Sequence, residues 1–481
     1  MYRFPAMALA WLVLQAAAAA AAADAGTAAA ATPAAARSIV GDWDGALNVS
    51  AVRLRLAFHI TSGAAGLTGA LDSIDQQASG IPLTRVAVEG DKVHIEIAAV
   101  HGTFDGTLDA SGGTLAGEWR QGAGVLPLQL TRRAAGQAQA VLRRPQTPVK
   151  PYPYREEEVT FADADAGADV RLAGTLTLPQ GAGPFPAVVL VSGSGPNTRN
   201  EPIVGHQLFL VLADHLTRHG IAVLRYDKRG TGRSTGDYGK ATSRDFADDA
   251  RAAGVYLRGR SEIDPKHVGL IGHSEGGLIV PMVAVRDPSV AFIVMLAGPG
   301  VNGAEVWLEQ LKLILAAAGM APDKIAIAAG QRQRIIDIIR SEPDLDKAAP
   351  KVRAVLREQA PQATPEQLDA VVNQVNTRWF REFFAYEPAP VLRQVRRPVL
   401  VLAGTKDVQV SAAQSLPRIR EALSGNPDVE IDALPGLNHL FQTARTGAIS
   451  EYSEIEETMA PVALDTVTRW IRAHTLGPGT P

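Results

Sequence analysis

The stretch that decides the fold is VGLIGHSEGGLIVPMVAV, residues 268–285. Residues 268–271 are small and apolar, as in a buried strand, and residues 277–285 form a plausible helix. Between them lies the pattern G-x-S-x-G, from Gly272 to Gly276, with Ser274 at its centre. A strand that runs into a serine and a helix that leaves it make a sharp turn, which projects the hydroxyl above the sheet. Ser274 is therefore the candidate nucleophile.

A second stretch, Gly232 to Gly236, matches the same pattern around Ser234. It lies in a loop rich in Gly, Thr and Arg, and the residues that follow it do not begin a helix. Because the strand and the helix are both missing, we interpret this second match as fortuitous.

A serine hydroxyl needs a base, and histidine is the side chain whose pKa suits that role near neutrality. The histidines that follow Ser274 are His439 and His474. His474 ends a predicted amphipathic helix, 462–473, where a solvated role suffices. His439 follows a predicted strand, 429–433, in a Pro-Gly-Leu-Asn-His loop, and is the candidate base; an ordinary surface histidine is the alternative.

The third member must be a carboxylate that orients the imidazole. Asp407 follows the run PVLVLAG, residues 398–404, and so lies at the carboxyl end of a clear strand. Seven other aspartates either lack a preceding strand or lie at the start of or within one, and we interpret them as solvated surface charges. They are Asp323, Asp337, Asp344, Asp346, Asp369, Asp428 and Asp432.

Strands alternate with amphipathic helices from Glu156 onward, which is typical of a mostly parallel sheet covered on both faces. The predicted strands are 171–178, 187–191, 221–226, 267–271, 291–296, 399–403 and 429–433. The catalytic domain is predicted over 156–475. It contains an insertion with helical periodicity, 303–390, which we interpret as a cap. The cap aromatics either line an apolar pocket or, as we favour, pack the cap onto its domain; they are Trp307, Trp379, Phe380, Phe383, Phe384 and Tyr386.

Upstream, residues 38–133 read as a small all-β domain, a barrel or sandwich, with strand patterns at 52–60 and 93–97 and frequent glycines between strands. Trp43 and Trp119 are predicted to be core residues, and His59, His94 and His101 show no metal-ligand spacing. Residues 134–155 are predicted to be an interdomain linker.

Residues 1–23 have one positive charge, an apolar run and then alanines, the layout of a signal peptide cleaved near Ala23. An Ala-rich linker, 24–37, follows. A membrane anchor is the alternative, but the apolar run is shorter than a span requires. We therefore expect a periplasmic or secreted protein. The formal net charge of -3 argues against a nucleic-acid partner, and the absence of cysteine excludes disulfides and thiolate metal sites.

A developing oxyanion needs backbone N–H donors, usually from the residue after the nucleophile and from the loop after the third strand. These would be Glu275 and, in the Val-Ser-Gly-Ser-Gly-Pro stretch 191–196, Ser194.

Together these motifs resemble the α/β-hydrolase superfamily, within it the bacterial esterases of the serine aminopeptidase-like and dienelactone-hydrolase-like branches. The resemblance covers 156 to about 474 and includes the stretch RYDKRGTGRS, 225–234, which looks structural, so Asp227 and Arg229 receive no catalytic role. Many relatives carry histidine where this chain has Ser192, and acidic residues where it has Asn197 and Asn200.

The resemblance implies a serine hydrolase that cleaves a small-molecule carboxylic ester without a cofactor or metal. A peptidase that acts near a free amino terminus is the first alternative. A non-catalytic protein that binds a lipid or glycan on a hydrolase scaffold is the second, since fold alone does not establish function.

Overall fold

A computed structural model describes residues 38–476, apart from gaps at 50–51, 65, 75–77, 122–123, 135, 138–142, 164–169 and 362. The predicted signal peptide and the Ala-rich linker lie outside the described residues. Of the described residues, 38–143 with 353–372 form one compact unit, and 144–352 with 373–476 form the other. The domain boundaries expected from the sequence remain predictions.

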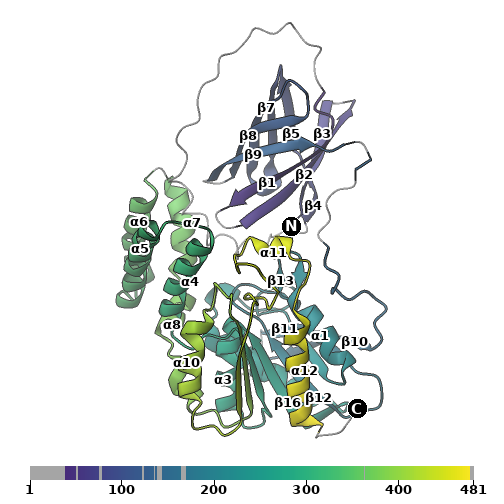
Figure 1. The fold of residues 1–481 in the computed structure, drawn as a ribbon, viewed down its shortest axis with the longest axis vertical. Helices are drawn as coiled ribbons and strands as arrows, with labels where there is room; N and C mark the ends of the chain where they lie inside the picture. The colour runs from purple at the N-terminus through teal and green to yellow at the C-terminus, as the bar shows by residue number, and fades with distance from the viewer. Residues whose placement is uncertain are drawn as a thin grey trace. The chain divides into compact units, whose positions relative to one another are not determined.

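Residues 41–132 form a nine-stranded antiparallel sheet, purple to blue in Figure 1. Its strands are β1 (Gly41–Val49), β2 (Val52–Gly63), β3 (Gly66–Ser73), β4 (Ala78–Pro82), β5 (Arg85–Glu89), β6 (Lys92–Ile97), β7 (Gly102–Leu108), β8 (Thr114–Gln121) and β9 (Gly124–Arg132). The order is β4-β3-β2-β1-β9-β8-β7-β6-β5. Because only Leu83 and Thr84 separate the two edge strands in sequence, the sheet must curl back on itself. This half-barrel confirms the expected all-β fold.

This sheet buries one face in a hydrophobic core of its own. In β6 the apolar Val93, Ile95 and Ile97 are buried while the residues between them are half-buried, the alternation of a sheet with one covered face. Trp43 and Trp119 both belong to this core, and the Trp43 indole donates to the Ile39 carbonyl at 2.8 Å. The two tryptophans are therefore packing residues, as predicted.

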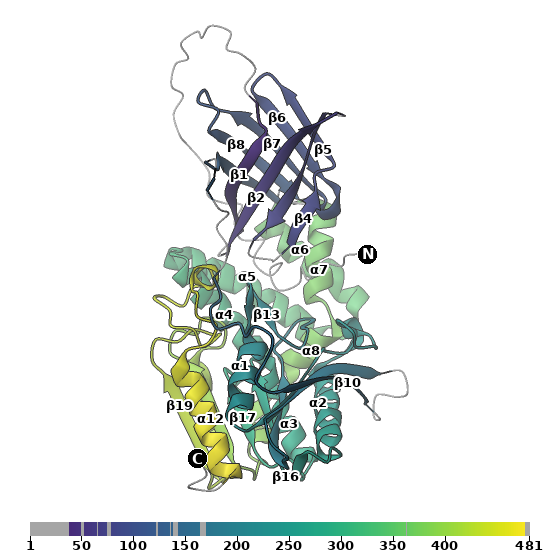
Figure 2. The same ribbon diagram turned by 90° about the vertical axis from the view of Figure 1, so that its right-hand side faces the viewer.

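The second unit is built on an eight-stranded sheet of order β10-β11-β15-β12-β16-β17-β18-β19. Its strands are β10 (Arg155–Ala162), β11 (Arg171–Leu178), β12 (Phe185–Val191), β15 (Ala222–Tyr226), β16 (Ile263–His273), β17 (Ile293–Leu296), β18 (Val399–Gly404) and β19 (Val429–Leu434). Strand β11 pairs antiparallel with both β10 and β15. All neighbours from β15 to β19 in this order are parallel. The carboxyl ends of the parallel strands therefore meet at one edge of the sheet (Figure 2).

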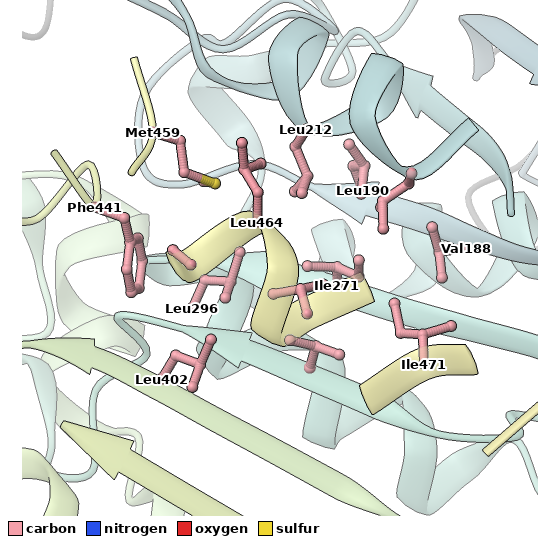
Figure 3. Close-up of a cluster of buried hydrophobic side chains, with 14 of the residues drawn as sticks. Val188, Leu190, Leu212, Ile271, Leu296, Leu402, Phe441, Met459, Leu464 and Ile471 are labelled. Carbon is pink, nitrogen blue, oxygen red and sulfur yellow. The ribbon is translucent and has the colours of Figure 1, made fainter. Parts of the chain in front are cut away.

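Helices cover both faces of this sheet. On one face, α1 (Leu208–Arg218) and α12 (Pro461–Thr475) pack through Leu212, Leu464 and Ile471 onto strand residues such as Leu190 and Leu402 (Figure 3). Helices α2 (Ser243–Arg258) and α3 (Glu275–Arg286) contact the same strands but contribute nothing to that cluster, so they cover the opposite face. Completely buried strands explain the nearly continuous apolar runs in the sequence.

Six helices lie in the chain between β17 and β18, where the sequence predicts a cap. They are α4 (Gly303–Ala317), α5 (Pro322–Ser341), α6 (Leu345–Gln359), α7 (Pro365–Val375), α8 (Arg378–Ala385) and α9 (Pro388–Leu392). The remaining elements are short, except for α10; they are β13 (Pro202–Ile203), β14 (His206–Gln207), α10 (Ala412–Ala422), α11 (Glu451–Glu454) and two 3-10 turns, η2 (Ala98–Val100) and η3 (Tyr238–Lys240). No described helix is both long enough and apolar enough to cross a membrane.

Candidate active site

Ser274 lies in the turn between β16 and α3, at the N-cap position of the helix, and its side chain makes no capping bond. Its backbone has φ 54° and ψ -117°, a conformation that costs energy for any residue other than glycine. The turn is held because the Ser274 N–H donates to the Leu296 carbonyl at 2.8 Å and its carbonyl accepts from Gly277 N at 2.9 Å. The residue is half-buried, so solvent reaches it at the carboxyl end of the strand.

The glycines around Ser274 are required by close backbone approach. A Cβ on Gly276 would lie 2.0 Å from the Val191 carbonyl oxygen, and one on Gly272 would lie 2.0 Å from the Gly276 oxygen. Both distances are much shorter than a van der Waals contact, and the clashing atoms are backbone atoms, which cannot move away as a flexible side chain can. The two glycines of the G-x-S-x-G pattern are therefore required because the turn packs closely on itself and on the neighbouring strand.

Asp407 and His439 come together from the loops that follow β18 and β19. His439 Nδ1 lies 2.7 Å from Asp407 Oδ2, and both side chains are buried. The other carboxylate oxygen of Asp407 accepts from the backbone N–H groups of Gln409 at 2.7 Å and Val410 at 2.8 Å. The carboxylate thus has three polar contacts, which fix its position beside His439.

His273, beside the candidate nucleophile, ties the two loops together. Its Nε2 donates to the His439 carbonyl at 3.0 Å, and the two imidazole rings lie 4.9 Å apart. Its Nδ1 lies 3.0 Å from Glu201 Oε1, and both residues are buried. Burial alone would lower the pKa of His273, but the charge of Glu201 and the hydrogen bond to it raise that pKa above its ordinary value. A buried histidine–carboxylate pair therefore supports the loop that carries His439.

The loop after β12 approaches Ser274 closely. A Cβ on Gly193 would lie 3.1 Å from the Ser274 Cβ and 3.0 Å from Glu201 Oε1. The Gly193 N–H is already used, since it donates to Glu201 Oε1 at 2.7 Å. The next residue, Ser194, is exposed, and its carbonyl accepts from the Asn197 amide at 3.0 Å. Ser194, the predicted oxyanion donor, thus lies in a loop that is held in place beside Ser274.

Glu275, the other predicted oxyanion donor, occupies the first position of α3, and its side chain is buried with three partners. Its Oε2 accepts from Lys228 Nζ at 3.0 Å. Its Oε1 accepts from the Ser243 hydroxyl and from the Trp379 indole N–H, both at 2.7 Å. Since Trp379 belongs to α8, a helix of the predicted cap is bonded directly to the residue after the candidate nucleophile.

The rejected candidates have other partners. The Ser234 hydroxyl is buried, donates to the Asp227 carbonyl at 2.7 Å and accepts from the Ala173 N–H at 2.9 Å. His474 accompanies Asp428 at 3.3 Å, at the end of α12. Both sets of contacts are structural.

The cap aromatics pack on one another. Trp307, Phe380 and Phe384 are all buried, with ring centroids 5.2 to 5.5 Å apart. Trp379 stacks on Phe383 at 4.7 Å. These contacts favour the packing interpretation of the cap aromatics.

The sequence assigns no role at this site to Glu201, His273 or Lys228, and it does not predict the bond of Trp379 to Glu275. Glu201 directly follows Asn200 in the sequence, so the loop that carries Asn197 and Asn200 also contains an acidic residue. Among the described residues, no cluster of three or more metal-ligating side chains could hold a metal ion.

Comparisons with known proteins found one family model and several similar chains. A family model described as "Serine aminopeptidase, S33" matches residues 206–443. The esterase EstD of Thermotoga maritima is 29% identical over 293 residues, which are 61% of this chain and 61% of the relative. An uncharacterised protein of Mycobacterium tuberculosis is 30% identical over 217 residues, 42% of this chain and 72% of the relative. A solved esterase of Pyrococcus furiosus has 16% identity and a TM-score of 0.42, and the match covers 70% of this chain and 98% of that one.

Proposed function

Because the chain belongs to the α/β-hydrolase superfamily of serine hydrolases, we propose that it is an exported esterase with Ser274, His439 and Asp407 as its catalytic triad. The observation that carries the proposal is the 2.7 Å contact between His439 Nδ1 and Asp407 Oδ2, on loops joined to the strained turn of Ser274 through His273. A buried carboxylate bonded to Nδ1 can orient the imidazole and stabilise its protonated form, which is the role of the third member of a triad.

In the proposed reaction, Ser274 Oγ attacks the ester carbonyl carbon while His439 Nε2 accepts its proton. Asp407 keeps the imidazole in the tautomer with the proton on Nδ1 and stabilises the imidazolium that forms. The N–H groups of Ser194 and Glu275 bind the oxyanion. His439 then protonates the alcohol as it leaves, and water hydrolyses the acyl-enzyme with His439 again as base.

The test is hydrolysis of p-nitrophenyl esters of increasing chain length, beside an amino-terminal peptide anilide, by the purified protein. Ester turnover by wild type that falls on the order of a thousandfold or more in Ser274→Ala is the expected result. Ser234→Ala, at the second G-x-S-x-G match, is the matched control and should keep its activity if it folds. Cleavage of the anilide alone would favour a peptidase, which the family model's description makes the second candidate. Cleavage of neither would reopen the binding-protein hypothesis.

The export part of the proposal is supported by the sequence of residues 1–23, which lie outside the described residues. Mass spectrometry of the protein from a periplasmic fraction should find an amino terminus at or near Asp24. Recovery of the full-length chain from the cytoplasm would contradict export and leave the proposed chemistry unaffected.

A further inference from the structure

Lys228 is a buried cation that the proposed mechanism does not use. Only 2% of its surface is exposed, and it lies two residues beyond the carboxyl end of β15. Its ammonium donates to the Gly193 carbonyl at 2.7 Å and to Glu275 Oε2 at 3.0 Å, and it lies 4.2 Å from the centre of the Phe246 ring. An ammonium has three donors, and each of these faces an acceptor or a π-face. The partners of this buried ammonium are therefore protein groups.

The bond to Gly193 fixes the direction of the neighbouring N–H. The Gly193–Ser194 peptide is trans, so the Gly193 carbonyl and the Ser194 N–H point in opposite directions. Lys228 and the Asn197 amide, at 2.9 Å, both donate to that carbonyl. The Ser194 N–H is thus turned away from Lys228. The positive charge of Lys228 beside the Gly193 carbonyl also polarises the Gly193–Ser194 peptide group, which makes the Ser194 N–H a stronger donor.

The same ammonium holds the other oxyanion donor. Glu275 supplies the backbone N–H at the first turn of α3, and its carboxylate is fixed between Lys228 and the Trp379 indole. We propose that Lys228 is the positioning residue of the oxyanion hole: it joins the loop of Ser194 to the first residue of α3, and so sets the spacing of the two N–H donors. This inference rests on the proposed function.

The arrangement also explains why charges are buried here. The Gly193 peptide segment is held at its N–H by Glu201 and at its carbonyl by Lys228. Glu201 is in turn bonded to His273, and Lys228 forms an ion pair with Glu275. Such pairs do little for stability, because desolvation offsets most of the attraction. They do fix donors before the reaction begins, which is what an oxyanion hole requires.

The experiment compares Lys228→Met with wild type in ester hydrolysis. Methionine has a similar length and no charge. Loss of one oxyanion donor costs about 10²- to 10³-fold in kcat, so a misplaced pair should lower kcat by about 30- to 300-fold with KM changed less than about threefold. The affinity for a trifluoromethyl ketone, which forms a tetrahedral adduct, should fall in parallel with kcat/KM, whereas a purely structural role would not move that affinity. Arg258→Met, which removes a part-buried ion pair with Asp287, is the control for lost stability and should keep kcat.

If Lys228→Met does not fold, Lys228→Met with Glu275→Gln removes both charges and should show the same loss of kcat. Wild type that hydrolyses esters, a dead Ser274→Ala, and a Lys228→Met or double variant within threefold of wild-type kcat would overturn this inference and leave the proposed function standing. Wild type that neither hydrolyses esters nor binds the ketone would overturn both.

Discussion

Replacing Asp407 by asparagine tests the triad by changing one atom. Asparagine can keep Oδ1 as acceptor for the backbone N–H groups of Gln409 and Val410, so the loop should stay in place. Its NH₂ group then occupies the position of Oδ2, 2.7 Å from His439 Nδ1. Because two donors cannot face each other, the imidazole must move its proton to Nε2, and it can no longer accept the proton of Ser274.

We expect kcat to fall by about 10⁴, which corresponds to about 5.5 kcal/mol in the activation free energy. The free energy of unfolding should change by only about 1 kcal/mol, because one charged hydrogen bond is replaced and no cavity forms. Hydrolysis of a p-nitrophenyl ester at pH 7 measures the first quantity, and denaturant unfolding measures the second.

Asp428→Asn provides the matched control. Asp428 also accompanies a histidine, His474 at 3.3 Å, but this pair is exposed and lies at the end of α12. This variant should keep wild-type kcat. The reasoning is refuted if a folded Asp407→Asn stays within tenfold of wild type, or if both variants lose activity equally.

Two further predictions concern stability. Burial, and next the positive charge of Arg144, lower the pKa of His206 to about 4. As the pH falls, the histidine is therefore protonated in the unfolded chain before it is protonated in the folded protein. The free energy of unfolding should thus decrease by up to about 3 kcal/mol as the pH drops from 6.5 to about 4. Denaturant unfolding of His206→Gln should show a correspondingly smaller loss across that window, and an unchanged loss would contradict the assignment. Because the half-barrel has its own core around Trp43 and Phe58, residues 38–133 expressed alone should unfold cooperatively on heating, with loss of far-UV and near-UV circular dichroism together; a gradual transition would show that this core is insufficient.

Strands of the catalytic unit were predictable because they are buried on both faces. The bounds predicted for β11 match those observed, and β18 and β19 each extend one residue further. The prediction missed β10, since its start, Arg155-Glu156-Glu157-Glu158, has the composition of a solvated segment. This edge strand is held by backbone pairing with β11, which leaves no apolar signature in the sequence.

The candidate triad could be found because each member follows a strand, so local sequence and chain order locate it. The supporting residues could not, because their contacts join distant parts of the chain. Lys228 and Glu275 are 47 residues apart, Trp379 and Glu275 104, and His273 and His439 166. No periodicity or turn chemistry encodes such separations, and charged residues in the sequence read as surface by default.

Strain and buried charge occur together at this edge of the sheet, and the combination has a physical reason. Glu201, Ser274 and Phe441 all have positive φ, of 46°, 54° and 61°, in the loops that carry the candidate site. Such conformations cost about 1 to 3 kcal/mol each and persist only where the surroundings determine them fully. Phe441 is anchored in the core between α12 and the sheet, and Ser274 by backbone bonds to the next strand. Glu201 has a backbone bond to the Thr198 carbonyl at 2.9 Å and, through its buried carboxylate, bonds to His273 and to the Gly193 N–H. The loop at Glu201 thus depends on a buried carboxylate as well as on backbone bonds, so removing that charge should loosen this loop before it unfolds the domain.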